Sequence, residues 1–470
     1  MVKYVVALSV LLLHATTAIA QGGICRGQLE TKITQLVNQP DWARSRFGIL
    51  LTIPDQPTPL YELGSNQFFT PASNAKILTT AAALTTFGPD YRIPTPLYTL
   101  GEKLIWVGQG DPSLDRQRVE FIARKIAEQR PNLNLKYLEI VDNYFPETPT
   151  DPTWEWSDLA FYYGSPVTSV IYNENTFDLI VNPGELGEPV QYDVSDAIAA
   201  QQWQITNEGI TVADGDYGLN IIAKPFSPEL TITGTLPARF TDDQWGMSVP
   251  NPSVYLGDTL QLILEGHGIA LETVTHTHTM PTYLGKPLAD YQPFDILYSP
   301  PIAELIADTN LSSNNLYAET LFQQVGVKIA ASPHQGVQLV LETLGVNPNS
   351  YRLADGSGLS RHNLVSPQAI VDTLEAVANT AQGNEFKQSL PVAGTSGTLR
   401  YRFQNSPLTG KVWGKTGTLT GTSALSGYLD HPHYGLLTFS IMVNNSDQPT
   451  SQQRATIDQI VTWFYELDDC

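Results

Sequence analysis

The sequence is poor in cysteine and in basic residues, and both shortages narrow the class of protein. Only 2 of the 470 residues are cysteine, which excludes a small disulfide-dense scaffold and a cysteine-rich metal site. The 26 lysines and arginines face 47 acidic residues, a formal net charge of −21. Because nucleic acid and anionic membrane surfaces are bound by basic faces, this charge argues against both as the main partner. The hydrophobic fraction of 42% still indicates a globular protein with a sizeable core.

Long apolar runs are also missing, apart from one at the amino terminus. Residues 1–20 combine Lys3, an apolar run over 5–13 and an A-x-A sequence that ends at Ala20. This is the pattern of a secretory signal peptide cleaved after Ala20. A membrane anchor is the alternative, but the run is short for a span, which takes ~20 residues. We therefore expect an exported protein with no stable membrane span.

The two cysteines lie at opposite ends of the mature chain. Cys25 follows the cleavage site closely, and Cys470 is the last residue. Lipidation of Cys25 is a weaker alternative, because Ile24 is an unsuitable residue before such a cysteine. In an oxidising compartment two cysteines form a disulfide if the chain ends are adjacent, as they often are in folded domains. We predict a disulfide between Cys25 and Cys470.

The hydrophobic pattern predicts helices and strands at both ends of the chain, around a β-rich middle. Helical patterning covers 27–38, 74–88 and 454–467 and resumes near 294, and strand patterning covers 46–53, 411–419, 423–430 and 435–445. Between about 95 and 290, short apolar runs alternate with turn residues, as in a β-rich region. The short turns between the three late strands predict an antiparallel meander. The fold is expected to be α+β, with helices packed on an antiparallel sheet and a large β-rich insertion.

Ser73 and Lys76 form an S-x-x-K motif at the start of a predicted helix. A spacing of three residues places both side chains on one helix face. A serine hydroxyl needs a base to become a nucleophile, and lysine serves only when burial or a nearby cation lowers its pKa. Alone, the motif is unspecific, since most serine and lysine pairs at this spacing lie on the surface.

Two further motifs follow in the chain. The run 312–315 reads Ser-Ser-Asn-Asn and holds S-x-N in two registers, either of which alone would pass for a helix cap. Lys415, Thr416 and Gly417 form K-T-G in a predicted strand, where the glycine lets a substrate backbone lie close. Motifs of the S-x-x-K, S-D-N and K-T-G types are the signature set of penicillin-binding proteins and class A β-lactamases. Here all three occur in order, each on the expected element.

On these motifs the sequence resembles the class C low-molecular-mass penicillin-binding proteins of the DacB type, which are D-alanyl-D-alanine carboxypeptidases and endopeptidases. The resemblance covers nearly the whole mature chain. It also rests on the segments 110–114, 141–145, 163–167, 173–175 and 355–360. The run SNNLYAE aligns the family serine with Ser313 and the family asparagine with Asn315. Asn314 departs from the aspartate that is common in the family, at a position that varies.

The resemblance implies a fold and a division of the chain. The fold is a penicillin-binding-protein or β-lactamase-like transpeptidase core, an antiparallel sheet flanked by helices with a helical subdomain. Residues 21–95 and 290–470 would form this catalytic domain, and 96–289 the β-rich inserted domain or domains. The compartment would be the periplasm.

The resemblance also implies residue roles. Ser73 would attack the carbonyl of the penultimate D-alanine, with Lys76 as the general base. Ser313 would pass a proton to the leaving amine, and Asn315 would hold the substrate amide. Lys415 would act near Lys76, and we expect its charge to lower the pKa of Lys76 by repulsion.

The K-T-G strand would bind the substrate. Lys415 and Thr416 would hold the terminal carboxylate, and Gly417 would allow close approach. The backbone N–H groups of Ser73 and Thr418 would form the oxyanion hole. Asp142 and Glu174 are candidates to meet a charged stem-peptide side chain, although solvation at the surface is the stronger explanation for each.

The implied partners are peptidoglycan stem peptides that end in D-Ala-D-Ala, with β-lactam antibiotics as inhibitors. No cofactor and no metal site is expected, since His276 and His278 have no third ligand in sight. Two other functions stay open: a serine β-lactamase, which shares the motifs, and an inactive cell-wall-binding relative. The chain lacks the Y-x-N of class C β-lactamases, and its motif residues are intact.

Overall fold

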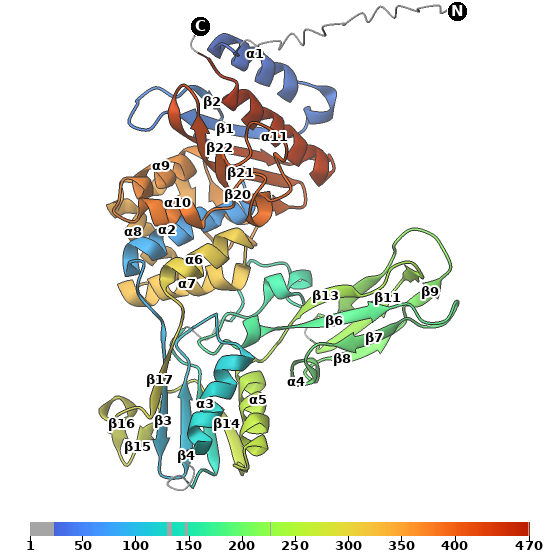
Figure 1. Ribbon diagram of the computed structural model, residues 1–470, viewed down its shortest axis with the longest axis vertical. Coiled ribbons are helices and arrows are strands. Elements are labelled where there is room, and N and C mark those ends of the chain that lie inside the picture. Colours follow the sequence, from blue (N-terminus) through green and yellow to red (C-terminus); the bar gives the residue numbers. More distant parts are fainter. Residues whose placement is uncertain (1–22, 129–133, 146–148, 226, 469) are drawn as a thin grey trace, which may run out of the picture.

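The computed structural model describes residues 23–128, 134–145, 149–225, 227–468 and 470. We call residues 23–93 and 299–470 the core, and residues 94–298 the insertion. Figure 1 shows the core as one body of helices and sheet, from which two smaller units of the insertion extend. The predicted signal peptide at 1–20 lies outside the described residues.

A five-stranded antiparallel sheet organises the core, in the order β2-β1-β22-β21-β20. Its strands are β1 (Arg46–Thr52), β2 (Tyr61–Leu63), β20 (Val412–Leu419), β21 (Thr422–His431) and β22 (Gly435–Asn444). The pairing of β20 with β21 and of β21 with β22 confirms the predicted meander. Strand β20 is the sheet edge, so its outer side is available to other parts of the core.

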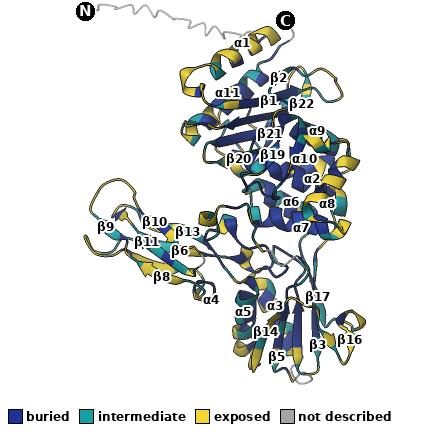
Figure 2. Ribbon diagram, turned by 180° about the vertical axis from the view of Figure 1, so that it is seen from behind, coloured by how far each residue is buried: buried dark blue, intermediate teal, exposed yellow. Residues whose placement is uncertain are grey.

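Helices cover both faces of this sheet. On one face lie α1 (Arg26–Val37) and α11 (Thr450–Tyr465), whose apolar side chains pack against the strands. The helical layer on the other face consists of α2 (Ala75–Phe87), α6 (Ile302–Leu311), α7 (Asn315–Ile329), α8 (Pro333–Thr343), α9 (Pro367–Ala378) and α10 (Gly383–Ser389). All residues of α2 from Ala75 to Leu84 are buried, which its small side chains permit. Figure 2 shows the sheet and the helices around α2 as the buried centre.

The two ends of the described chain lie side by side. Cys25 and Cys470 are joined by a disulfide. Beside it, the backbone N–H of Ile24 donates to the carbonyl of Glu466 at 2.7 Å. The disulfide and this backbone pairing join the first helix to the last, which places both termini at one end of the core (Figure 1).

The first unit of the insertion is a five-stranded mixed sheet in the order β14-β5-β4-β3-β17. Its strands are β3 (Pro94–Leu100), β4 (Lys103–Val107), β5 (Tyr137–Val141), β14 (Thr273–Thr277) and β17 (Asp295–Tyr298). Helices α3 (Arg116–Glu128) and α5 (Pro252–Gly266) pack together, and their apolar residues share a cluster with those of this sheet.

The second unit is an arm of short strands that projects sideways (Figure 1). Its strands are β6 (Thr176–Asn182), β7 (Gln191–Val194), β8 (Gln204–Asn207), β9 (Ile210–Val212), β10 (Asn220–Ala223), β11 (Glu229–Thr233), β12 (Thr235–Pro237) and β13 (Asp243–Ser248), with α4 at Ala197–Ala200. Two small hairpin-like pairs complete the described strands: β15 (Thr282–Tyr283) with β16 (Lys286–Pro287), and β18 (Tyr351–Arg352) with β19 (Leu364–Val365).

Two local expectations were wrong. The helix expected near 294 begins only at Ile302, because 295–298 form β17 and pair with β3 of the insertion. Pro300 and Pro301 separate this strand from α6. The β-rich region also contains α3 and α5, which the strand patterning overlooked. Helix α3 buries Val119, Ile122, Ala123 and Ile126, a helical spacing visible in the sequence.

Candidate active site

Ser73 lies in a tight turn that leads into the central helix. The 3-10 segment η2 (Ala72–Asn74) precedes α2 directly, and the preceding Ala72 has φ +47°. A positive φ is sparsely populated for a residue with a Cβ, so the surrounding structure must hold this turn in place. Asn74 contributes, since its Nδ2 donates to Ser426 Oγ of β21 at 2.7 Å. The turn and the sheet thereby fix Ser73 at the mouth of α2.

Lys76 is buried beneath Ser73 and makes three hydrogen bonds. Its Nζ lies 3.0 Å from Ser73 Oγ, 2.7 Å from Asn315 Oδ1 and 2.7 Å from the carbonyl of Ser357. Its exposed fraction is 0%. The Lys76 ammonium is therefore aligned with the serine hydroxyl by two further acceptors.

Burial lowers the pKa of Lys76 to about 7, against the charges of Asp355 and Glu319, which raise it. An ammonium out of water loses hydration that these carboxylates replace only in part. Burial, one of the two causes expected from the sequence, is the largest cause of this shift. The repulsion between the two lysines, the other expected cause, contributes to the lowered pKa of Lys415. Burial lowers the pKa of Lys415 well below its ordinary value, and Lys76 lowers it further.

The run 312–315 adopts one of its two registers. Ser313 has φ +64°, and its Oγ accepts from Lys415 Nζ at 2.8 Å. Asn315 accepts from Lys76, and its Nδ2 donates to the carbonyl of Tyr163 at 2.8 Å. By contrast, Asn314 caps α7 and Ser312 bonds back to Asp308. The S-x-N pair that reaches the lysines is thus Ser313 and Asn315.

Strand β20 lies against the turn that carries Ser73. Lys415 is fully buried, while Thr416 Oγ1 donates to Thr398 Oγ1 at 2.8 Å. A Cβ on Gly417 would lie 2.6 Å from the Pro71 carbonyl oxygen and 3.2 Å from Ser73 N. Only glycine lets the strand approach the turn so closely. Thr418, which follows, accepts from Arg454 Nη2 at 3.2 Å.

An open cleft of about 750 Å³ lies over these groups. Of the predicted residues, its wall includes Ser73, Ser313, Asn315, Thr416 and Thr418. The two lysines are buried behind this wall. The cations on the wall are Arg361 and Arg454, and its carboxylates are Glu155, Asp158 and Glu174.

Glu174 and Asp142, the two candidates for a stem-peptide contact, lie in different parts of the structure. Glu174 lines the cleft and accepts from Asn314 Nδ2 at 2.7 Å. Asp142 is buried elsewhere and accepts from the Ser169 N–H at 2.8 Å and from Ser253 Oγ at 3.0 Å. Asp142 therefore has a structural role in the insertion.

Sequence reasoning missed Glu319 and Arg454. Glu319 is the one acidic residue in the apolar stretch LYAETLF of α7, which was a usable signal. Its carboxylate accepts from the N–H groups of Gly356 and Ser357, and burial raises its pKa to about 8. Arg454 begins the face of α11 that meets the cleft, and nothing in the local sequence marks it.

The fold and this cluster define a class of site. A serine at a helix start, a buried lysine of lowered pKa within hydrogen-bond distance and a second serine bound to a second lysine are the parts of a serine acyl-transfer centre. The parts come from a helix, a loop and a sheet edge that are far apart in the chain.

Comparison with known proteins agrees with this class. The model of the D-Ala-D-Ala carboxypeptidase 3 (S13) family matches residues 29–467. The penicillin-sensitive carboxypeptidase A of Dictyostelium discoideum is 30% identical over 86% of this chain and 83% of its own length. The D-alanyl-D-alanine carboxypeptidase of Actinomadura sp. (strain R39) is 28% identical over 93% of this chain and 85% of its own.

Among solved structures, penicillin binding protein 4 (dacB) from Haemophilus influenzae superposes with a TM-score of 0.78 at 24% identity, covering 93% of this chain and 99% of that one. The penicillin-recognising α+β fold predicted from the motifs is confirmed. The chain belongs to the D-Ala-D-Ala carboxypeptidase 3 (S13) family, a family of serine peptidases, and the predicted enzyme class is confirmed with it.

Proposed function

We propose that this protein removes the terminal D-alanine of peptidoglycan stem peptides through an acyl-enzyme on Ser73. The observation that supports this most directly is the 3.0 Å hydrogen bond between Ser73 Oγ and Lys76 Nζ. With a pKa of about 7, a large part of the Lys76 population is neutral at physiological pH. A neutral amine at this distance accepts the hydroxyl proton as the serine attacks.

The reaction divides into two transfers. In the first, Ser73 Oγ bonds to the carbonyl carbon of the penultimate residue, and its proton passes to Lys76 Nζ. The C–N bond then breaks, and the leaving amine takes a proton through Ser313, whose hydroxyl is bound to Lys415, while Lys76 gives up the proton that it took from Ser73. In the second transfer, water attacks the ester carbonyl carbon and gives a proton to Lys76, which passes it to Ser73 Oγ as the ester C–O bond breaks. Asn315, held by Lys76 and by Tyr163 O, orients the substrate amide.

As Ser73 attacks, negative charge develops on the carbonyl oxygen of the substrate. The backbone N–H groups of Ser73 and Thr418 donate hydrogen bonds to this oxygen. The close approach of Gly417 to Ser73 N supports this pairing, since it brings β20 beside the nucleophile turn. Loss of one donor in such a hole typically costs ~10²–10³ in rate. The substrate carboxylate lies along Thr416 and Thr418, with Arg454 beside Thr418 and Lys415 buried behind them.

The test uses labelled penicillin and purified muropeptides. A β-lactam is expected to acylate Ser73, as a penicillin or β-lactam occupies related proteins. Ser73→Ala should show no labelling, whereas Ser227→Ala, a serine of the insertion arm, should label like the wild type. Stoichiometric labelling of Ser73→Ala would overturn the proposal.

The same preparation distinguishes the neighbouring activities. Loss of one D-alanine from a muropeptide identifies the carboxypeptidase, and conversion of cross-linked dimers to monomers identifies an endopeptidase. A penicilloyl adduct that hydrolyses within seconds would instead indicate a β-lactamase. We expect D-alanine release with a long-lived adduct.

Export to the periplasm belongs to this proposal. The disulfide requires an oxidising compartment, and peptidoglycan lies outside the cytoplasm. None of the described helices is long and apolar enough to cross a membrane. Mass spectrometry of the exported protein should give a chain that starts at Gln21 and is two hydrogens lighter than its reduced form.

A further inference from the structure

The loop 355–360 (Asp-Gly-Ser-Gly-Leu-Ser) touches both reacting groups. The carbonyl of Ser357 accepts from Lys76 Nζ at 2.7 Å. Gly358 has φ +86°, and a Cβ there would lie 1.9 Å from the Ala72 carbonyl oxygen and 3.0 Å from Ser73 N. The loop thus packs directly against the turn that carries the nucleophile. Its position fixes the base and the serine relative to each other.

Asp355 holds this loop together. Its carboxylate accepts from Gly358 N at 2.8 Å, Ser360 N at 2.6 Å and Asn363 Nδ2 at 2.7 Å, all within the same segment. A further donor, Trp154 Nε1 at 2.8 Å, comes from the insertion. Asp355 and Trp154 are both at least nine-tenths buried, so this bond is shielded from water. Hydrogen bonds to a charged group are the stronger ones, and burial strengthens them further.

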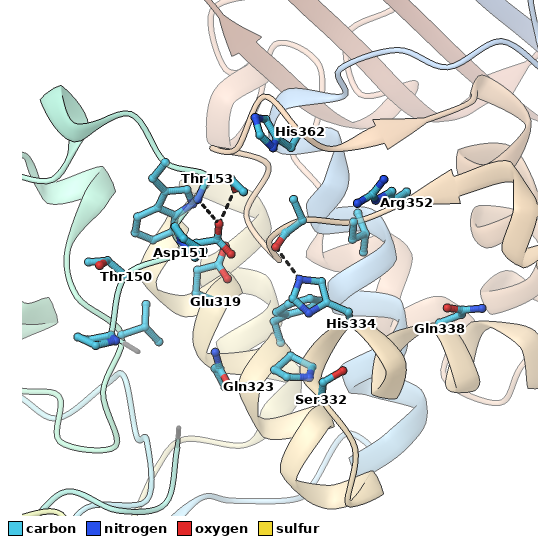
Figure 3. Close-up of a pocket in the computed structure, with 18 of the residues that line it drawn as sticks. Thr150, Asp151, Thr153, Glu319, Gln323, Ser332, His334, Gln338, Arg352 and His362 are labelled. Atoms are coloured by element: carbon cyan, nitrogen blue, oxygen red, sulfur yellow. Dashed lines mark hydrogen bonds between the residues drawn. The ribbon is translucent and has the colours of Figure 1, made fainter. Parts of the chain in front are cut away.

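The insertion meets the core around this point through polar contacts, among them the ion pair between Arg361 and Glu155. Thr153 Oγ1 shares a hydrogen bond with Ser360 Oγ, beside the Trp154 bond. Behind these two contacts lies a cavity of about 640 Å³ between the 149–154 segment and helices α7 and α8. Figure 3 shows Thr150 and Asp151 on one side of this cavity and Gln323, Ser332 and His334 on the other. Trp154 also packs in a buried apolar cluster with Leu316 of α7, so its indole hydrogen bond adds a directional contact to this packing.

We propose that Trp154 is a positioning residue for Lys76: its indole N–H, supplied by the insertion, anchors Asp355 and with it the loop that aligns Lys76 with Ser73. This inference rests on the proposed function of Lys76 as the base. It gives the insertion a part in the chemistry of the core, beyond any contact it makes with substrate.

The charges around Lys76 predict the direction in which its pKa should move when Trp154 is changed. Lys76 faces Asp355 of the loop, Glu319 of α7 and Lys415 of β20. The indole N–H offsets part of the negative charge of Asp355. Without this donor the carboxylate acts more strongly on Lys76 and raises its pKa. Removing the carboxylate itself, as in Asp355→Asn, lowers the pKa of Lys76.

The experiment compares two tryptophan variants of the full mature chain. Trp154→Phe keeps an aromatic ring and removes the N–H. Trp203→Phe is the matched control, because Trp203 Nε1 donates to the Ser248 carbonyl at 2.8 Å elsewhere in the insertion. Rate constants of acylation by a penicillin are measured from pH 5 to 9. Unfolding midpoints are recorded for both variants, so that a loss of fold is recognised.

We expect Trp154→Phe to acylate roughly tenfold more slowly at neutral pH, the effect of one bond to a charged group, with the acid limb of its pH profile moved to higher pH. Trp203→Phe should match the wild type in rate and profile. In the Asp355→Asn background, Trp154→Phe should move the acid limb little further, since the charge that the indole N–H offsets is gone.

The inference would be overturned by a wild-type rate and profile for Trp154→Phe, by an equal loss in Trp203→Phe, or by additive effects with Asp355→Asn. Failure of the proposed function is recognised separately, because it would show as labelling of Ser73→Ala. A slow Trp154→Phe with an unshifted acid limb also contradicts a role through Lys76.

Discussion

At the scale of single residues, the proposed function depends on a lysine whose pKa is lowered, so that part of its population is uncharged at neutral pH. Lys76 is buried completely, and its pKa falls to about 7 although two carboxylates oppose the shift. The motif spacing predicted the Ser73 and Lys76 pair. Burial, one of the two causes expected from the sequence, is the larger one, and repulsion by Lys415 was the other. Burial depends on packing by α7 and the 355–360 loop, which no local pattern reveals.

The pH dependence of acylation follows from this pKa. The neutral amine is the competent base, so activity is lost as pH falls through the pKa and is present above it. The acylation rate constant should have its acid midpoint near pH 7, and fall about tenfold per pH unit below it. Lys76→Arg, which stays protonated, should lose at least ~10²-fold at every pH. An acid midpoint near the ordinary lysine value would contradict this mechanism.

At the scale of elements, the site forms where a helix start, a loop and a sheet edge converge. The strand patterning predicted β20, β21 and β22, and the helical patterning predicted α2. The approach of β20 to the Ser73 turn was expected only from the resemblance and not from local patterns, because the contact joins segments about 340 residues apart, as with Gly417 and Ser73. Glycine at 417 is the local feature that permits it.

Gly417→Ala tests this approach. The added Cβ would meet the Pro71 carbonyl oxygen at 2.6 Å, so β20 must move away from the turn. We expect acylation by penicillin to fall about 10²-fold, as when an oxyanion donor is displaced. Gly27→Ala, where a Cβ has nothing within 4 Å, is the control and should acylate normally. Equal rates for the two variants would show that the strand tolerates the extra atom.

At the scale of the whole molecule, a disulfide joins the two ends of the core, while the insertion extends away from the core. The disulfide spans a sequence separation of 445 residues, so it restricts nearly the whole unfolded chain. Replacing both cysteines with serine should lower the free energy of unfolding by about 2–5 kcal/mol. This change is measured by unfolding the protein in urea while its tryptophan fluorescence is monitored.

The oxidised wild type in reductant should match the double serine variant, and reductant should leave that variant unchanged. Acylation by the folded variant should stay at the wild-type rate. Cys470 follows the carboxyl end of α11, whereas Arg454, which lines the cleft, lies near the amino end of this helix. A midpoint equal to that of the oxidised wild type would contradict a stabilising role.

The sequence alone determined the motifs, their order, most helices and strands of the core, and the cysteines that pair. These features are local, or they follow from residue types whose chemistry is limited. The insertion was predicted as β-rich, but α3 and α5 were overlooked because turn residues dominate its composition.

Only the tertiary structure decided that Asp142 is structural, and that Glu319, Arg454 and Trp154 lie at or behind the cleft. Each of these depends on contacts between distant segments. Burial, which sets the pKa of Lys76, and the bond that carries the insertion's indole to Asp355 exist only once the chain has packed.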